Sequence, residues 1–151
     1  MGKGQLQPNI PHTIVEGSCA TSSGIAMGDV VILNTALSPD GWKKGDTAGA
    51  LIAAGVAVND VSNTETLVDV LIKGRIAVRA EEAIEPNSHI KVGSTGGVMQ
   101  FDAGVDDPDM KKGFFAGYHD NPVDGGGLQQ DPYTRKAAAL NDIIIVDWEN
   151  S

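Results

Sequence analysis

The sequence is poor in several residue types, and each shortage argues against a class of protein. Cysteine occurs once in 151 residues, so Cys19 has no intrachain disulfide partner and the chain needs no oxidising compartment. Lysine and arginine number 11 against 20 acidic residues, and the net charge of -9 disfavours binding to nucleic-acid phosphates. No apolar run approaches the roughly 20 residues that cross a bilayer. We therefore expect no nucleic-acid partner, no membrane partner and no secretion.

Glycine and β-branched residues are plentiful instead, and their spacing predicts the fold class. Short β-branched runs alternate with Gly, Asn, Asp and Ser from His12 onward, which is typical of an all-β domain with little helix. The chain is long enough for one domain with its own core, which we place at residues 12–151. Residues 1–11 hold isolated Leu6 and Ile10 among Gly, Gln, Asn and Pro, which predicts a flexible N-terminal arm.

Eight segments have the composition of strands. They are His12–Glu16, Asp29–Asn34, Ala50–Asn59, Leu67–Ala80, Ser88–Gly93, Val98–Phe101, Phe114–Tyr118 and Asp142–Trp148. The fourth alternates apolar and polar residues over an unusual length, so Gly74 in its interior predicts a bulge or bend where the strand changes partner. The fifth and sixth flank Gly-Ser-Thr-Gly-Gly and predict a β-hairpin.

Two segments are harder to assign, and one pattern repeats. Ala48–Val58 is apolar and Ala-rich, so a short helix competes with a buried strand there. His119–Leu140 is rich in turn-forming residues and predicts a long loop, in which only Thr134–Leu140 offers one or two helical turns. The segments that begin at Gly55 and Gly113 each lead through a loop to an apolar strand, which is either an internal repeat or two unrelated hairpins.

No group of residues has the spacing of a catalytic or metal site. His12, His89 and His119 lack a second His or Cys at ligand spacing, and His89 falls on the polar face of its strand. Cys19 lies in Gly-Ser-Cys-Ala-Thr, without a nucleophile motif, and is expected to be a partly buried packing residue.

The acidic residues also fail as an ion site. They gather at Asp102, Asp106, Asp107 and Asp109, and again at Asp120 and Asp124. Counted from Asp102, a calcium loop would need Gly at its sixth position and Glu at its twelfth, where the chain has Asp107 and Gly113. The glycine-rich stretches lack the Lys-Ser/Thr of a phosphate-binding loop. We therefore predict no enzyme activity, no cofactor and no metal, and a domain that binds a surface.

The chain resembles the small capsid decoration, or cement, proteins of tailed phages and related viruses. The resemblance rests on Val-Glu-Gly at Val15–Gly17, a Met-Gly-Asp-Val-Val-Ile-Leu strand at Met27–Leu33, Gly55–Val61, the ribbon Val68–Val78 and the closing strand Asn141–Trp148. It extends mainly over His12–Phe101, about two-thirds of the chain, and its motifs are weakly specific. The long His119–Leu140 segment departs from it.

The resemblance implies a compact β-barrel or β-sandwich-like domain of the β-tulip type. It implies a structural virion protein, made in the host cytoplasm, that forms a homotrimer on the outer surface of an icosahedral capsid and cements adjacent major capsid proteins. It also implies that the arm contacts the capsid, through Gln5, Leu6, Gln7, Pro8, Asn9, Ile10 and Pro11.

Three other functions compete with capsid cementing. One is a head-tail or tail-fibre accessory module of a virion. Another is a small trimeric β-barrel enzyme such as a nucleotide hydrolase, whose acidic and Ser/Gly motifs have no counterpart here. The third is a carrier domain with a modified lysine at a hairpin tip, but Lys73 and Lys91 both fall inside predicted strands.

Overall fold

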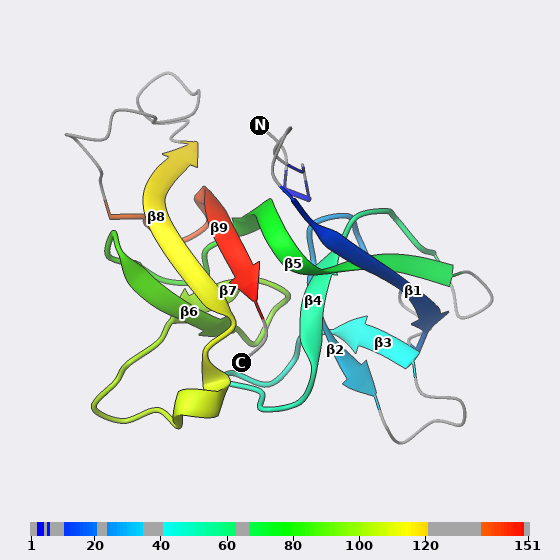
Figure 1. Cartoon of the computed structure of the whole chain (residues 1–151), viewed down its shortest axis with the longest axis horizontal. Coiled ribbons are helices and arrows are strands. Elements are labelled where there is room, and N and C mark those ends of the chain that lie inside the picture. Colours follow the sequence, from blue (N-terminus) through cyan, green and yellow to red (C-terminus); the bar gives the residue numbers. More distant parts are fainter. Residues whose placement is uncertain are drawn as a thin grey trace.

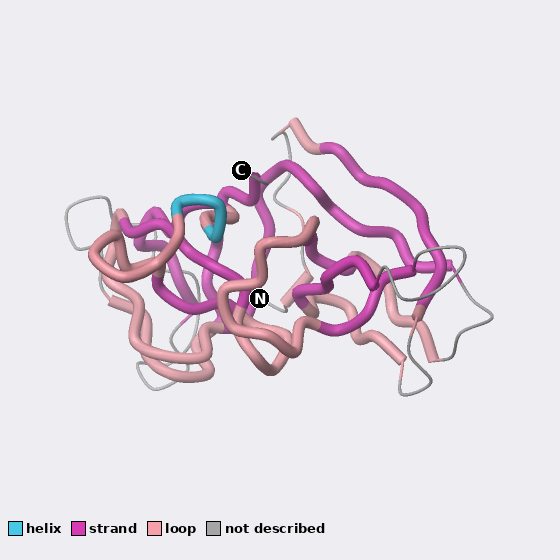
Figure 2. Tube along the Cα trace, turned by 90° about the horizontal axis from the view of Figure 1, so that it is seen from below, coloured by secondary structure: helices cyan, strands magenta, loops and turns pink. Residues whose placement is uncertain are grey.

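The structure is nearly all β, as the sequence predicts. It is a computed structural model that describes residues 3–4, 6, 11–20, 24–34, 41–62, 67–120 and 137–149, with the backbone alone at 116–120. Its nine strands form one sheet in the order β1-β3-β2-β4-β5-β9-β8-β6-β7, and β1 also pairs with β5. Figure 2 shows that strands and loops make up the described chain apart from one turn of 3₁₀ helix at Pro108–Met110.

The strands match the eight predicted segments and add one. They are β1 (Thr13–Cys19), β2 (Val30–Asn34), β3 (Gly41–Lys44), β4 (Ala54–Ala57), β5 (Leu67–Arg79), β6 (Ser88–Val92), β7 (Val98–Gln100), β8 (Gly113–Asp120) and β9 (Ile143–Glu149). Strand β3 was not predicted, because four residues that include two lysines give no clear alternation. The predicted hairpin is confirmed as β6 and β7, with Val92 opposite Val98.

Two assignments that the sequence left open are settled or corrected. Ala54–Ala57 is a buried strand within the Ala-rich segment, and no helix forms among residues 48–58. The helical turns predicted at the end of His119–Leu140 are wrong for residues 137–140, because Ala138 forms an antiparallel bridge with Ile84. That bridge satisfies the backbone of Ala138 through two hydrogen bonds with Ile84, at 2.8 and 3.1 Å. Residues 121–136 lie outside the described chain.

Strand β5 is the centre of the fold because it belongs to two groups of strands. Its first half pairs with β1 and β4, and from Lys73 onward it pairs with β9 (Figure 1). The change of partner falls at Gly74, whose φ of 139° suits glycine and disfavours other residues. A Cβ at that position would lie 2.6 Å from His12 Cβ, so the close approach of the chain also requires glycine. The predicted role of Gly74 is thus confirmed.

The two groups are copies of the same five-stranded unit. In the first unit β1 lies parallel to β3 and antiparallel to β5, while β2 pairs with β3 and β4, and β4 pairs with β5. In the second unit Ala80, the residue after β5, forms a parallel bridge with Val98 of β7, and β5 pairs with β9. Strand β6 pairs with β7 and β8, and β8 pairs with β9. Each unit is therefore a closed ring of strand pairings, and β5 is shared.

Two further contacts occupy matching places in the two units. Ile25 bridges Val61 in the first unit, as Ile84 bridges Ala138 in the second. The Ala20 amide donates to Trp42 at 2.6 Å, and the Glu81 amide donates to Val98 at 2.9 Å in the matching place.

The glycines that prompted the idea of a repeat also match. Gly55 lies opposite Val31 on β2, and Gly113 lies opposite Ile90, the counterpart of Val31, on β6. A Cβ on Gly55 would lie 2.6 Å from the carbonyl oxygen of Leu71, and one on Gly113 would meet the carbonyl oxygen of Asp147. The internal repeat is thus confirmed.

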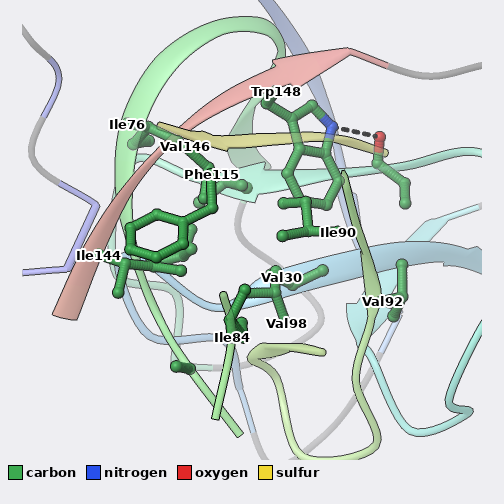
Figure 3. Packing of buried hydrophobic residues seen from close by; sticks show 14 of the residues in the cluster. Val30, Ile76, Ile84, Ile90, Val92, Val98, Phe115, Ile144, Val146 and Trp148 are labelled. Carbon is green, nitrogen blue, oxygen red and sulfur yellow. Dashed lines mark hydrogen bonds between the residues drawn. The ribbon is translucent and has the colours of Figure 1, made fainter. Parts of the chain in front are cut away.

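Each unit has its own apolar interior, and the two interiors meet across β2 and β4. The smaller cluster lines the first ring and includes Cys19, Val31, Trp42, Val68 and Val70. The larger cluster lines the second ring and extends to the opposite faces of β2 and β4. Alternate residues of β2 point into different clusters, as the two-residue period of a strand requires. In Figure 3 the indole of Trp148 lies in the larger cluster and donates to the Ala54 carbonyl of β4, at 3.4 Å.

Candidate functional site

The predicted arm does not lie wholly apart from the body of the protein. Of the seven residues predicted to contact a capsid, the structure describes Leu6 and Pro11. Pro11 is exposed, whereas Leu6 is half-buried, packs against the larger cluster and forms an antiparallel bridge with Ile76 of β5. The other five, Gln5, Gln7, Pro8, Asn9 and Ile10, lie outside the described residues.

Lys3 and Gly4 add to this contact. The Gly4 amide donates to the carbonyl oxygen of Ala77 at 2.6 Å, on the edge of β5 that does not face β9. The Lys3 ammonium lies 2.6 Å from the carboxylate of Asp29, whose side chain is only 4% exposed. In Figure 1 this segment lies beside the end of β5, next to the start of β1. Sequence reasoning missed Lys3, Gly4 and Asp29, because nothing local signals that a glycine-rich start returns to the sheet.

Lys3 and Gly4 therefore lie between β5 and the turn that precedes β2. We call the place that they occupy the β5 groove and define it by Ile76 and Ala77 on one side and by Met27, Gly28 and Asp29 on the other. The Asp29 carboxylate also accepts a hydrogen bond from the Ala26 amide at 2.9 Å, so both of its oxygens are engaged. This ion pair is costly to break, because the buried Asp29 carboxylate would lose the opposite charge of Lys3 and keep only the Ala26 amide among the described residues.

A shallow hollow of about 630 Å³ adjoins the groove at Asp29. Its wall also includes Asp60, but the Asp60 carboxylate accepts a hydrogen bond from the Met27 amide at 2.7 Å. Both carboxylates therefore serve the local backbone, and their arrangement is that of a braced turn.

The acidic segment is built around hydrogen bonds of its own. Asp106 forms an ion pair of 2.7 Å with Lys91 and accepts the Asp102 amide at 2.9 Å. The bond from Lys91 holds the pKa of Asp106 below its ordinary value. Asp107 accepts the Asp109 amide at 2.9 Å and so caps the 3₁₀ turn. Within the described residues no group of three or more His, Cys, Asp or Glu side chains could hold a metal ion.

The remaining candidates take structural positions. Cys19 is buried in the first unit, more deeply than the partial burial expected, and His89 is exposed on β6, as predicted. Lys73 lies inside β5 and Lys91 inside β6, so neither occupies the hairpin tip of a modified carrier lysine. The helical turn in the described part of the chain is too short to cross a membrane.

Comparison with known proteins shows the fold. No protein-family profile matches the sequence, and neither does any curated protein. A solved structure described as "the crystal structure of head fiber gp8.5 N base in bacteriophage phi29" matches with a TM-score of 0.58 and 13% sequence identity, over 92% of this chain and 95% of that chain. The chain thus has the fold of a phage head-fibre base over nearly its whole length.

Proposed function

We propose that the protein is a structural component of a phage virion that binds the outer surface of the icosahedral head. The observation that carries this proposal is the fold shared with the head-fibre base, which covers almost all of both chains. A fold alone does not define a function, but two further features favour the same role. The described residues form no metal-binding cluster, and the acidic charge suits a layer that faces solvent rather than packaged DNA.

The finer proposal is that the protein cements adjacent major capsid proteins as a homotrimer. Its contact with the shell is the arm, through Gln5–Pro11, which would pair with an edge strand of the capsid protein. Because Leu6 packs against the chain's own core, Ile10 is the apolar side chain that the arm offers to the shell without breaking that contact. The prolines at 8 and 11 limit strand pairing to part of the arm.

A second candidate is the base of a head fibre, and the comparison favours it directly. The matched chain is itself the N-terminal base of such a fibre. In this alternative the protein would bind the same outer surface but would anchor another part, without joining capsid subunits.

Shell binding tests the proposal and separates the two roles. We expect the full chain to sediment with expanded, DNA-filled heads of the phage that encodes it, and not with immature shells. A cement protein should raise the temperature at which the heads break, whereas a fibre base should bind without that effect. Failure to bind heads in either state would overturn the proposal.

A matched variant tests the arm. Deletion of residues 7–10 removes Ile10 and keeps Lys3, Gly4 and Leu6. If the register of β1 on β5 continued upstream, Ile76 would face residue 10, but it faces Leu6, four residues earlier. The deletion therefore lets the remaining chain follow β5 in one continuous register. We expect unchanged stability and at least tenfold weaker shell binding, and equal binding would show that the contact lies elsewhere.

A further inference from the structure

The β5 groove has the properties of a peptide-binding site. Its occupant makes a main-chain hydrogen bond to a sheet edge, an ion pair with a buried carboxylate and an apolar contact with the core. Main-chain hydrogen bonds to a sheet edge and places for side chains are the contacts by which peptides add to sheets. Gly4 makes the hydrogen bond, Lys3 makes the ion pair and Leu6 makes the apolar contact.

The groove selects glycine in the middle of this segment. Gly4 has a φ of 79° and Gly28, across the groove, has a φ of 86°. A Cβ on Gly4 would lie 2.5 Å from Met27 Cγ and 2.7 Å from the Gly28 amide nitrogen. A Cβ on Gly28 would lie 2.5 Å from the carbonyl carbon of Lys3. Two glycines thus allow the two backbones to touch, and a side chain on either would separate them.

The chain offers one other segment in a position to fill the groove, and it does not fit. Ile10 lies four residues after Leu6, so a slip of four would bring it opposite Ile76 and bring Pro8 to the place of Gly4. Proline has no amide hydrogen for the Ala77 carbonyl, and its φ is fixed near -65°. Of the two stretches of the arm compared, the groove therefore fits the one with Lys3, Gly4 and Leu6.

We propose that the β5 groove also accepts Lys3, Gly4 and Leu6 of a second copy of this chain, so that the N-terminal segment links copies. The tether from Leu6 to β1 has four residues more than the register on β5 requires, so the segment has the length to leave its own body. A tether of so few residues gives an effective concentration in the millimolar range, so the chain's own segment fills the groove in dilute solution. The N-terminal segments of neighbouring copies compete for the groove where the protein is packed at a similar local concentration. This inference does not depend on the proposed function.

Cross-linking of the unmodified chain tests the exchange. Chains labelled with ¹⁴N and ¹⁵N are mixed in equal amounts and treated with a carbodiimide, which joins an ammonium directly to a carboxylate. At micromolar concentration we expect cross-links between Lys3 and Asp29 that carry one isotope only. At millimolar concentration, complete exchange would give mixed isotopes in half of these cross-links. Absence of mixed cross-links at every concentration would overturn the proposal.

A pair of charge reversals tests the same exchange without cross-linking. Lys3→Glu and Asp29→Lys each place like charges in their own groove, but each variant supplies the segment that the other's groove requires. We expect the 1:1 mixture to form mixed oligomers by native mass spectrometry, whereas each variant alone and the double variant K3E/D29K at the same micromolar concentration do not. Two folded variants that remain unassociated in the mixture would overturn the proposal. If Asp29→Lys does not fold, Asp29→Asn is mixed with Lys3→Gln, because the Lys3–Asp29 cross-link can then form only between two different chains. Absence of this cross-link in the mixture at millimolar concentration would also overturn the proposal.

Discussion

The two five-stranded units have the same topology but differ in the side chains that they bury and bond. The first unit spans β1 to the first half of β5, and its interior holds Cys19 and Trp42. The second spans the rest of β5 to β9 and contains Lys112, which is only 2% exposed, and Glu81, whose carboxylate fills a hairpin loop. At the place equivalent to Glu81 the first unit has Ala20. The shared pairing pattern therefore fixes the architecture, and side chains at equivalent places are free to diverge.

The glycines at equivalent places are the strongest test of that equivalence. Gly113→Ala should destabilise the protein by about 3 kcal/mol, because the new Cβ would overlap the Asp147 carbonyl and the φ of 140° is strained for alanine. Gly55→Ala should cost about 2 kcal/mol, because its Cβ would overlap Val70 and Leu71 without that backbone strain. Chemical denaturation measures both.

The matched control is Gly104→Ala, whose Cβ would lie 3.4 Å from Asp102 and should change stability by less than about 0.5 kcal/mol. Because the units share β5, we expect one cooperative transition in every variant. Two separate transitions, one for each unit, would show that the units fold independently.

Lys112 distinguishes the second unit and should make stability depend on alkaline pH. Burial lowers the pKa of Lys112, and the nearby Asp109 only partly opposes this effect. The unfolded chain then binds more protons, so stability should rise as the pH increases from the lowered pKa towards 10.5. Lys112→Met should remove that rise and should gain about 1 kcal/mol at neutral pH, because the ammonium's only hydrogen bond, among the described residues, is a 3.4 Å contact with the Asp109 carbonyl. Equal pH profiles of the two proteins would contradict this.

Glu81 should produce a smaller effect at acidic pH. Burial raises the pKa of Glu81, but the amides of Thr95, Gly97 and Ser94 together lower it below 4.5. The stabilisation that the Glu81 carboxylate contributes is complete above pH 4.5 and is lost as the pH falls through the lowered pKa. Glu81→Gln should reduce stability by about 1 kcal/mol at pH 7 and by less at low pH. A constant difference across this range would show that the charge is not involved.

Much of the fold follows from local patterns, and the docked N-terminal segment does not. Alternation of residue types predicts the long strand β5, and Gly74 marks its change of partner because a bend needs glycine at that point. The repeat shows in sequence only at Gly55 and Gly113, since backbone crowding restricts those two places while apolar residues exchange freely.

Other features depend on tertiary contacts. Ala138 lies in a sequence that favours helix, yet its pairing with Ile84 places it beside the sheet. The pairing of Lys3 with Asp29 joins residues at distant positions that carry no shared motif. No periodicity identifies such a contact, so the candidate groove appears only when the two units are assembled.

A density map of the virion tests the central proposal most directly. The account predicts density for the two five-stranded units on the outer surface of the head, repeated at threefold or quasi-threefold positions, with the arm reaching the capsid protein. Purified heads that lack such density, from infections in which the protein is made, would contradict the account.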